Sequence, residues 1–412
     1  MELSSEQIDA RIQKNRTCEA TIAVAGAEGK PLANADVTVC QTRHKFLFGC
    51  NIFKFGRCAT PEQNETYQRR FKELLNFATL PFYWRSYEPK EGDTASAQRN
   101  EEIARWCKEN GVTAKGHPLF WTLEPPWVSQ TKTPDEAEAL LWGRISREVK
   151  QFDGLIDTWD ALNEGCIGPK QATSRSAGAA LHVYEKYGRQ SAIERAFARA
   201  REANPNAMLI LNDYNLTKQY EDLIRDCLKS GVTIDAIGLQ SHMHGGYWGA
   251  EKTWDACERF AKFKKPLHFT EVTIPSGKGK QLAPEKWEWT IAPGDEETQA
   301  RHIAEFYRVL FSHPATQAIT WWDFSDQGAW RNAPAGLLRK DMSPKPAYLV
   351  LQKLVKGEWW TGPLQLKTDA EGKARFRGFL GDYEIEAGGR RQTFRLLSNA
   401  KTPIPLKFPK VP

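Results

Sequence analysis

The sequence predicts an α/β protein, a (β/α)8 TIM barrel with a small accessory β-sandwich formed from the N- and C-terminal segments. Between residues 45 and 356, short apolar runs alternate eight times with longer amphipathic stretches, and a TIM barrel needs eight such units in ~250 residues with room for insertions. The runs are continuously apolar, which is typical of parallel strands covered on both faces. No GxGxxG follows the first run, and this disfavours a doubly wound open sheet.

The elements of the barrel follow from the period of the apolar residues along the chain. Uninterrupted apolar runs indicate buried strands, and apolar residues spaced three or four apart indicate amphipathic helices. The expected strands are residues 45–53, 77–84, 112–121, 155–164, 207–213, 234–242, 266–271 and 317–324. The clearest helical stretches between them are residues 61–77, 134–152, 189–205 and 295–313.

Both ends of the chain are expected to lie beside the barrel, which occupies residues 45–356. Residues 17–44 read as two alternating strands around a Gly/Pro turn, and residues 357–412 contain several more strands between the turns EG, LGD and GG. Neither end has enough strands for a core of its own, so we expect one shared sandwich. The tail resembles transthyretin-like or carboxypeptidase-regulatory-like β-modules, and we favour a structural role for it over carbohydrate binding.

Composition and charge exclude several classes of protein. The chain has 412 residues, 41% hydrophobic and 26% charged, as in ordinary globular proteins. Its net charge of +6 is spread without a run of five Lys or Arg, so we expect no nucleic-acid partner and no membrane partner. No apolar run reaches the length of a membrane span. The polar start of the chain lacks a signal-peptide core, so the protein is either cytoplasmic or begins after a removed signal.

Two expected strands end in a glutamate. The run WDALNE (159–164) ends in Glu164, and the run PLHFTE (266–271) ends in Glu271. The active site of a TIM barrel lies at the carboxyl ends of its strands, so both side chains should face one mouth. Two facing carboxylates suit glycoside hydrolysis, in which one gives a proton to the leaving oxygen and the other attacks the anomeric carbon. The alternative is that each glutamate forms a separate ion pair at the end of its strand. That alternative is weakened because both glutamates end an apolar run.

These runs and several others resemble glycoside hydrolase family 10, a family of retaining endo-β-1,4-xylanases on (β/α)8 barrels. WDALNE is similar to the acid/base signature of that family, and TEVTI (270–274) is similar to its nucleophile signature. Further motifs of the family occur in this chain in the same order as in the family, and with them the resemblance covers about residues 45–355. They are KGHPLFW (115–121), LNDYN (211–215), GLQSHMH (238–244), WWDFSDQGAW (321–330) and KPAY (345–348).

The resemblance implies a role for each matching residue. Glu164 becomes the general acid/base and Glu271 the nucleophile, a pair that needs no cofactor. Asn163 is expected to bind the sugar 2-OH at the cleavage point. The other expected substrate-binding residues are His242 and Gln240 beside Glu271, Tyr214 near the pair, His117 and Trp121 on the sugar-binding wall, and Trp322 and Trp330 as an aromatic floor or lid.

No metal site is expected. The eight cysteines form no CxxC or zinc-like spacing, and their even number leaves disulfides open. His242 and His244 share one face of an expected strand and offer two ligands, whereas a catalytic zinc normally needs three from the protein. We favour hydrogen bonding to substrate or to Glu271 for His242, and a place on the rim for His244.

The second strand departs from the family pattern. The family carries ENEMKW there, but this chain has TLPFYW (79–84), with Leu80 at the position of the asparagine and Tyr83 at that of the lysine. Thr122 replaces a histidine, and Glu124 stands where glutamine is common. Lost hydrogen bonds leave sugar hydroxyls unpaired. We therefore expect a different or decorated β-glycan, with Tyr83 offering a stacking face or a single hydroxyl.

The segment after the seventh strand, residues 272–297, is expected to be a long loop at the same mouth. It carries Lys278, Lys280, Trp287 and Trp289, and loops of this length are often functional. Its lysines would suit an acidic substituent such as a uronic acid, and a solvated loop is the equal alternative.

The sequence thus predicts a retaining β-glycoside hydrolase that cleaves a xylan-like polysaccharide by double displacement, with its two carboxyl groups ~5–5.5 Å apart. The alternatives are the same chemistry on a different or decorated β-glycan, exo action included, and a non-catalytic glycan-binding barrel. We expect a polysaccharide or oligosaccharide as the partner and a monomer in solution. A polymer cannot enter cells, so the family resemblance implies a secreted or periplasmic protein.

Overall fold

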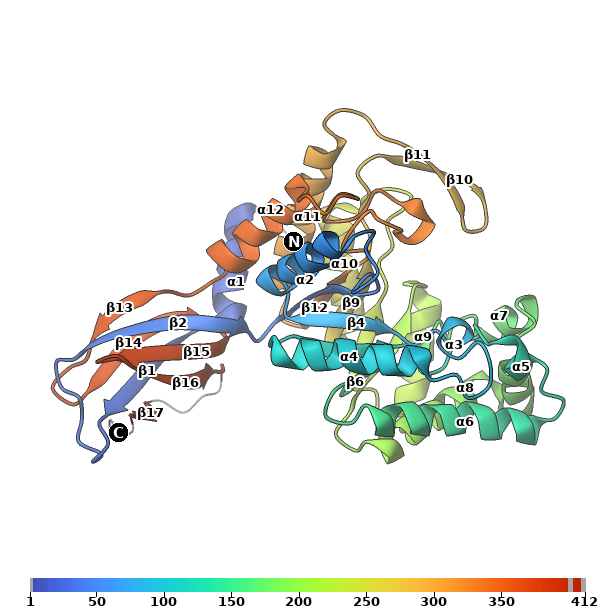
Figure 1. Cartoon of the computed structure of the whole chain (residues 1–412), viewed down its shortest axis with the longest axis horizontal. Coiled ribbons are helices and arrows are strands. Elements are labelled where there is room, and N and C mark those ends of the chain that lie inside the picture. Colours follow the sequence, from blue (N-terminus) through green and yellow to red (C-terminus); the bar gives the residue numbers. More distant parts are fainter. Residues whose placement is uncertain (1–2, 399–402, 409–412) are drawn as a thin grey trace.

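A closed barrel of eight parallel strands forms the centre of the protein in this computed structural model, which describes residues 3–398 and 403–408 (Figure 1). The strand order around the barrel is β12-β3-β4-β5-β6-β7-β8-β9, which confirms the predicted fold class. The strands are β3 (Leu47–Asn51), β4 (Phe77–Pro81), β5 (Thr113–His117), β6 (Thr158–Asn163), β7 (Met208–Asp213), β8 (Ala236–Leu239), β9 (Leu267–Val272) and β12 (Thr316–Trp321).

Several expected strands extend too far at their carboxyl ends. The second ends at Pro81, and Trp84 already begins the short helix α3 (Trp84–Tyr87). The sixth ends at Leu239, and Ser241 has a φ of 66°, a left-handed conformation outside the strand region. The residues just past a barrel strand line the mouth of the barrel and are still partly buried, so their apolar character continues beyond the ladder.

Helices cover the outside of the barrel, as the sequence predicts. Most begin with a sequence signal: Thr60, Thr133 and Thr217 cap three of them through their side chains. The expected helix starting at 189 is the second half of a longer helix that Gly188 interrupts with a φ of 73°. The helices are α2 (Pro61–Leu74), α4 (Ala95–Glu109), α5 (Pro126–Ser129), α6 (Pro134–Gln151), α7 (Gly168–Ser174), α8 (Gly178–Ala203), α9 (Lys218–Lys229), α10 (Gly249–Ala261), α11 (Asp295–Ser312), α12 (Pro346–Lys353), the 3₁₀ turn η1 (Trp330–Asn332) and the π turn η2 (Leu354–Glu358).

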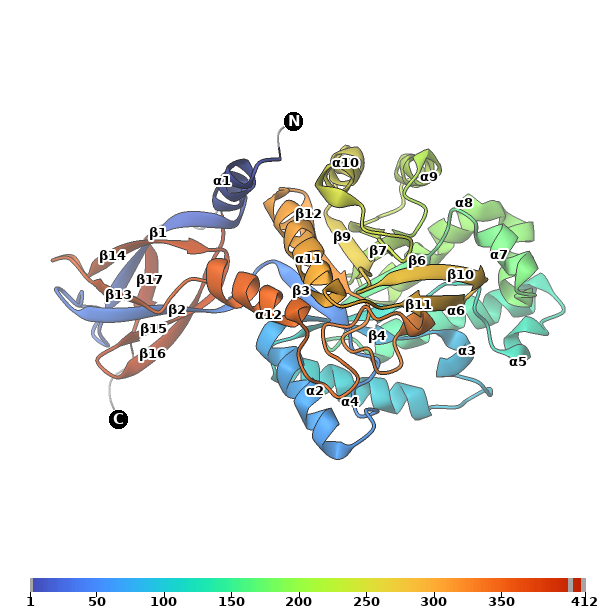
Figure 2. The same ribbon diagram turned by 90° about the horizontal axis from the view of Figure 1, so that it is seen from above.

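Strands from both ends of the chain pair with one another at one end of the molecule (Figure 2). One sheet has the order β14-β1-β17 and the other the order β13-β2-β15-β16. Their apolar faces enclose a small core of their own that includes Ile22, Val39 and Tyr383, so the accessory sheets predicted from the terminal segments are present. The strands are β1 (Thr17–Ala25), β2 (Asp36–His44), β13 (Leu364–Lys367), β14 (Lys373–Phe379), β15 (Gly381–Ala387), β16 (Arg390–Leu396) and β17 (Ile404–Lys407).

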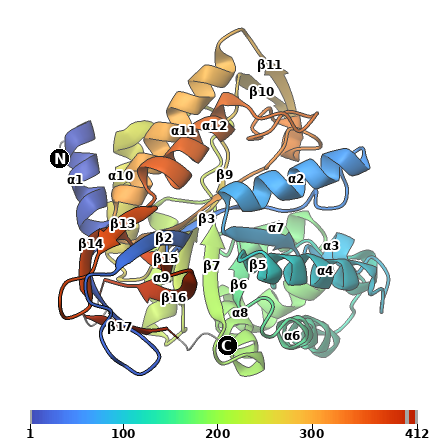
Figure 3. The same ribbon diagram turned by 60° about the vertical axis from the view of Figure 1, so that its left-hand side comes forward.

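Two elements near the barrel differ from the sequence-based expectation. A helix, α1 (Ser5–Arg16), precedes β1, buries Ile8 and Ile12, and runs beside α11 (Figure 3). The expected loop at 272–297 contains a hairpin of β10 (Lys278–Ala283) and β11 (Lys286–Thr290). The alternation in KWEWT is the period-two signal of a strand, and it places Trp287 and Trp289 on one face.

Two global features bear on chemistry. All eight cysteines are free thiols. Within residues 3–398 and 403–408, no helix combines the length and apolar character that crossing a membrane requires.

Candidate active site

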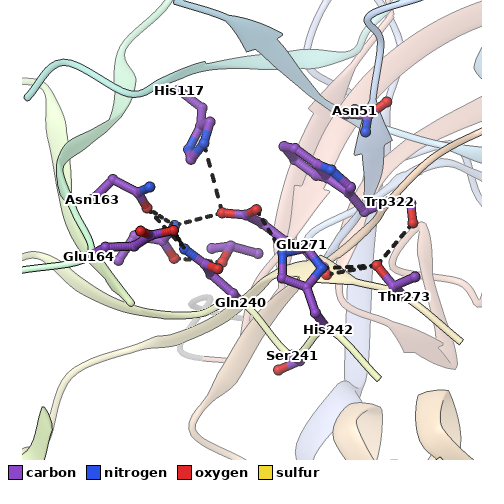
Figure 4. Close-up of polar contacts among 12 residues, drawn as sticks. Asn51, His117, Asn163, Glu164, Gln240, Ser241, His242, Glu271, Thr273 and Trp322 are labelled. Carbon is purple, nitrogen blue, oxygen red and sulfur yellow. Dashed lines mark hydrogen bonds and ion pairs between the residues drawn. The ribbon is translucent and has the colours of Figure 1, made fainter. Parts of the chain in front are cut away.

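The carboxyl ends of the barrel strands surround a cleft with a volume of ≈ 1190 Å³. Both Glu164 and Glu271 line it, together with the expected residues Tyr83, His117, Trp121, Asn163, Tyr214, Gln240, His242, Trp322 and Trp330. The barrel therefore brings together in one cavity every site residue that the sequence singled out. Figure 4 shows the two glutamates facing each other across the amide side chains of Asn163 and Gln240.

Glu271 lies at the end of β9 with only 5% of its surface exposed. Its Oε2 is 3.1 Å from Nε2 of His242, its Oε1 accepts a hydrogen bond of 2.9 Å from Asn212, and His117 Nε2 lies 3.8 Å from Oε1. Burial opposes ionisation, but His117, His242 and Lys115 outweigh it and lower the pKa of Glu271. The carboxylate is thus held ionised, as a nucleophile requires.

A buried ion cluster below Glu271 fixes the orientation of His117. Nδ1 of His117 is 2.6 Å from Oδ2 of Asp160, and Lys115 donates to the same oxygen at 2.7 Å. The two positive or polar partners overcome the burial of Asp160, so the pKa of this carboxyl is lowered. Because Nδ1 faces Asp160, the other ring nitrogen is directed at Glu271.

Glu164 follows β6 and has a φ of 58°. Its backbone N–H donates to the carbonyl of Asn212 at 2.8 Å. Trp121 Nε1 donates to Oε2 at 3.1 Å, Gln171 donates to the same oxygen, and Gln240 Nε2 lies 3.3 Å from Oε1. A register shift in β6 between Asp160 and Leu162 precedes this residue, and such irregularities re-aim side chains near active sites.

A network of amide side chains joins the two glutamates. Asn163 Oδ1 accepts hydrogen bonds from Asn212 at 2.8 Å and from Gln240 at 3.1 Å. Asn212 also donates to Glu271, and Gln240 also donates to Glu164. The same chain of four contacts therefore sets the position of both carboxylates. Among the described residues it leaves the Nδ2 group of Asn163 without a partner and so available to a ligand.

Gln240 lies closer to Glu164 than the family resemblance implies. Its side chain was expected beside Glu271, but the amide contacts Asn163 and Glu164 instead. Its backbone carbonyl accepts a hydrogen bond of 3.0 Å from the N–H of Glu271. Gln240 thus touches both glutamates, one through its side chain and one through its backbone.

Aromatic rings line the cleft around the glutamates. The ring of Trp322 lies 5.7 Å from that of His117 and 6.4 Å from that of His242, in edge contacts. Trp330 lies 4.7 Å from His242, and Tyr83 lies 5.2 Å from His117. Tyr214 stands at the mouth with 47% of its surface exposed. Flat apolar faces of this kind suit the C–H faces of sugar rings.

The second barrel strand contributes little polar surface to the cleft. Leu80 is completely buried and does not line the cavity, whereas Tyr83 does. Burial and then the charge of Glu271 raise the pKa of Tyr83 well above its usual range, so its hydroxyl stays neutral. Of the asparagine and lysine of the family pattern, the first has no polar replacement and the second is replaced by a single neutral hydroxyl.

The other two departures from the family pattern support the walls of the cleft. Thr122 donates to Gln171 at 3.3 Å, and Gln171 in turn contacts Glu164. Glu124 lies outside the cleft lining and accepts hydrogen bonds from the N–H groups of Ala179 and Ala180 at the start of α8. Burial raises the pKa of Glu124 to about 7.

His244 lies under the hairpin and is buried at the cleft wall. Its ring is 5.4 Å from Trp287 and 5.0 Å from Trp330, and burial lowers its pKa to about 3. The exposed rim position expected for His244 is therefore wrong. Lys278 and Lys280 are exposed on the hairpin and do not line the cavity. In the described part of the chain, no cluster of three or more His, Cys, Asp and Glu could hold a metal ion.

Sequence reasoning missed five polar residues of the site. Asp160 and Asn212 lie inside quoted motifs, and a polar residue within an apolar strand is the signal that could have found them. Asp323 also lies inside a motif and accepts hydrogen bonds from Asn51 at 2.5 Å and from the N–H of Trp330 at 2.7 Å. Asn51 and Gln171 lie outside every motif, and only the fold brings them to the cleft.

Comparisons with known proteins match this geometry. Anti-sigma-I factor RsgI6 of Acetivibrio thermocellus is 27% identical over 92% of this chain, which spans 46% of that protein. Endo-1,4-beta-xylanase 3 of Hypocrea jecorina is 28% identical over 64% of this chain and 70% of its own length. The structure of xylanase 10B from Thermotoga petrophila RKU-1 in complex with xylobiose has a TM-score of 0.63 at 24% identity, covering 76% of this chain and 95% of that one.

The two xylanase matches cover 64% and 76% of the chain, whereas the match to RsgI6 covers 92%. The family model for glycosyl hydrolase family 10 matches residues 43–354, from the end of β2 to the end of α12. This match takes in both glutamates, the amide network and the aromatic lining. The chain therefore belongs to glycosyl hydrolase family 10.

Proposed function

We propose that this chain is a retaining β-glycoside hydrolase that cleaves a xylan-like polysaccharide by double displacement, in the manner of an endo-1,4-β-xylanase. The observation that carries the proposal is the pair of glutamates held by one amide network in a single cleft, with Glu271 kept ionised by His117 and His242. Family membership supports the same reaction, and the names of the xylanase relatives point to the substrate.

The first half-reaction follows from the placement of the two carboxyl groups. Glu271 attacks the anomeric carbon and forms a bond to the sugar, while the bond to the leaving oxygen breaks. The protonated carboxyl of Glu164 gives its proton to that oxygen, so the leaving sugar departs as an alcohol. Asn163 supports this step because its free Nδ2 group can bind the sugar 2-OH, a contact that strengthens in the transition state.

The second half-reaction restores the enzyme. Glu164, now a carboxylate, takes a proton from water, and the oxygen of that water attacks the anomeric carbon. The bond between the sugar and Glu271 breaks, and Glu271 returns to its ionised form. Two inversions at one carbon retain the β configuration. The acid/base and the nucleophile carry the whole reaction.

The reaction is tested by trapping and by substitution. A 2-deoxy-2-fluoro xylobioside with a good leaving group should attach to Glu271, and peptide mass spectrometry should locate the added mass there. Glu271→Gln should abolish turnover of xylan, and Glu164→Gln should slow it while activated aryl glycosides are still attacked. An adduct on another residue, or full activity in Glu271→Gln, contradicts the proposal.

A different or decorated β-glycan is the second candidate, favoured by the second strand. Leu80 offers no polar contact to the cleft and Tyr83 offers one hydroxyl, so an unmodified xylose chain loses two contacts there. A panel of β-linked glycans, with and without side groups, separates the candidates by their kcat/KM values. Binding without hydrolysis of any member would favour the third candidate, a non-catalytic glycan-binding barrel.

We also propose that the protein works outside the cytoplasm, because a polysaccharide cannot cross a cell membrane. We further propose that the protein is a monomer, because one chain supplies every residue of the cleft described above. Fractionation of the native host and light scattering of the purified protein test these two points.

A further inference from the structure

Unpaired positive charge gathers at one end of the cleft. Lys54 and Arg57 lie in the loop after β3, Arg85 lies in α3 after β4, and all three line the cavity. Strands β3 and β4 are neighbours in the barrel, so the two loops form one end of the cleft. Within residues 3–398 and 403–408, none of these three side chains has an ion pair or a hydrogen bond with another residue.

The remaining cations of the cleft are paired or stacked. Arg331 forms an ion pair of 2.8 Å with Glu285, and Arg175 covers the ring of Trp121 at 4.5 Å and donates to Thr122. The carboxylate of Asp323 lies near Lys54 and offsets part of its charge, although it makes no ion pair with it and accepts its hydrogen bonds from Asn51 and the Trp330 backbone. Among the described residues that line the cleft, the cationic side chains without an ion pair or a hydrogen bond are therefore those of the β3 and β4 loops.

This end of the cleft belongs to the nucleophile. Tyr83 packs on His117, and His117 faces Glu271. Phe53, next to Lys54, contacts Tyr83 at 5.9 Å and Trp322 at 5.1 Å. Glu164 serves the leaving group and is contacted by Trp121 and Gln171, so we assign the glycone side to the β3 and β4 loops. Tyr83 lies between the two sides, because its ring is also 5.7 Å from that of Trp121.

The loop after β12 leaves room for Lys54. A Cβ atom on Gly328 would lie 2.6 Å from Nζ of Lys54, and Gly328 has a φ of 67°. Glycine is the residue that accepts both this backbone conformation and this close approach. The ammonium group of Lys54 thus lies against the loop after β12 at the cleft wall.

Asn51 precedes Lys54 by three residues and completes the arrangement. Only 2% of Asn51 is exposed, and it lines the cleft with its Nδ2 bound to Asp323. The family motif ENEMKW on the second strand contains an asparagine and a lysine in the spacing Asn-x-x-Lys. In this chain Leu80 and Tyr83 stand at those two positions. In this chain the same pair of side-chain types stands one strand earlier, where Oδ1 of Asn51 is left to accept a hydroxyl.

We propose that Asn51, Lys54 and Arg85, with Arg57 at the rim, form a glycone-side subsite for a sugar that bears a carboxylate, such as a hexuronic acid unit of a β-glycan. The inference rests on the proposed hydrolase function and names the substrate class of the same cleft. Asn51 and Tyr83 hold sugar hydroxyls. Lys54 and the guanidinium groups bind the carboxylate, an anion that Arg meets with two parallel hydrogen bonds.

Charge argues for an acidic rather than a neutral sugar. Lys54, Arg57 and Arg85 carry the same charge and line the same cavity, so a bound carboxylate gains an attraction there that a neutral sugar does not. Arg57 also lies close enough to Arg99 to add to the effect of burial, which lowers the pKa of Arg99 to about 10. A bound carboxylate relieves this repulsion and gains attraction in a partly enclosed cleft.

Kinetics on matched substrates test the subsite. One set of β-1,4-xylo-oligosaccharides carries a glucuronic acid branch at each backbone position in turn, and a neutral set has the same backbone length. We expect the best acidic member to exceed the neutral one about tenfold in kcat/KM at low salt, and the preference to shrink at ~0.5 M salt because the contact is between charges. Lys54→Met should remove most of the preference, because it lowers kcat/KM for the acidic set much more than for the neutral set.

Two further variants serve as controls. Lys54→Arg keeps the charge and should keep the preference. Lys229→Met removes one exposed positive charge at the end of α9, on the opposite end of the barrel, and should leave both values unchanged. If Lys54→Met does not fold, the exposed Arg85→Met variant is used, with the same expected loss of preference.

Calorimetry on the Glu271→Gln protein separates this inference from the hydrolase proposal. Tighter binding of an acidic oligosaccharide than of the neutral one, lost in the added Lys54→Met substitution, supports the subsite even when no glycan is hydrolysed, and in that case the hydrolase proposal alone fails. Equal binding and equal kcat/KM for the acidic and neutral sets overturn the subsite and leave the hydrolase proposal intact. An equal loss on both sets in Lys54→Met also overturns it.

Discussion

At the scale of single residues, the site depends on a buried cluster of charged side chains in which Lys115 and His117 share one oxygen of Asp160. Lys115, Asp160 and His117 are buried in the barrel, and their contacts run in one line to Glu271. Burying charge is costly, and partners in good geometry offset that cost only together. Removing one member leaves the others uncompensated, so this cluster should couple stability, the position of His117 and the ionisation of Glu271.

Asp160→Asn should lower the free energy of unfolding by about 3–5 kcal/mol at neutral pH, because Lys115 and His117 lose their anionic partner. The pKa of Asp160 is lowered in the folded protein, so its stabilisation is present above the unfolded pKa of about 3.9 and is lost as pH falls through the folded pKa. Urea unfolding between neutral and acid pH should therefore show the difference from wild type shrinking with acid. A difference that does not depend on pH would contradict this account.

His242→Gln should move the acid limb of the kcat/KM profile to higher pH. His242 helps to lower the pKa of Glu271, and glutamine keeps a hydrogen-bond donor without the charge. Without that charge, the pKa of Glu271 should rise. His182→Gln is the matched control, because the hydrogen bond of His182 within the described part of the chain goes to the carbonyl of Thr131, outside the cleft lining. Identical acid limbs in wild type and His242→Gln would show that the charge of His242 does not act on Glu271.

At the scale of elements, the β10–β11 hairpin forms part of the cleft wall. Trp287 and Trp289 stack at 5.6 Å, and Trp287 reaches the cavity next to His244. Trp289 Nε1 donates to the carbonyl of Arg331 at 3.0 Å, which ties the hairpin to the turn that carries Trp330. The hairpin is otherwise exposed, so these aromatic contacts hold it in place.

Trp289→Ala should raise KM for a long oligosaccharide by about threefold or more and leave kcat nearly unchanged, because Trp289 supports the wall without lining the cleft. Leu282→Ala changes an exposed residue of the same hairpin and should have no effect. Steady-state kinetics on both variants decides the point. A fall in kcat with constant KM would mean that the hairpin acts in the transition state instead.

At the scale of the whole molecule, the terminal sheets and the barrel share a junction. β2 leads through His44 almost directly into β3, and the imidazole Nε2 lies 2.9 Å from the carbonyl of Val355. Burial lowers the pKa of His44 to about 3. Its ring also contacts Phe48 of the barrel and Phe379 of β14. One buried side chain thus touches both parts of the fold.

Deleting residues 357–412 should lower the melting temperature by several degrees or make the protein aggregate. The deletion uncovers β1 and β2, whose inner faces pack on the missing strands, and exposed edges and apolar faces associate. Thermal unfolding of the full and shortened chains measures this. Unchanged melting would show that the barrel does not depend on the terminal sheets.

A carbohydrate-binding role for the terminal sheets gains no support from their surface. The exposed large hydrophobic side chains of the described residues, Tyr214, Leu282, Ile291 and Leu349, all lie in the part of the chain matched by the family model. Stacking platforms for sugars need exposed aromatic rings. Retention of the shortened chain on immobilised glycan, corrected for folded fraction, should therefore equal that of the full chain.

The sequence by itself determined the barrel, the pair of glutamates and most of the cleft lining. Apolar runs with fixed periods specify strands and helices locally, and the barrel rule then places every residue that follows a strand at one mouth. Glu164, Glu271 and Trp322 each follow or end such a run, so their convergence was predictable. The terminal strands were predictable for the same reason, from their alternation and turn residues.

Only the tertiary structure decided which polar groups meet between those residues. Asn212 joins Asn163 to Glu271, and Asn51 and Lys54 reach the cleft from a strand that carries no motif. Such contacts join side chains far apart in sequence, across neighbouring or facing strands. The local period of apolar residues does not specify which amide side chain hydrogen-bonds to which carboxylate. That choice is made when the barrel closes, because a buried polar group without a partner costs free energy.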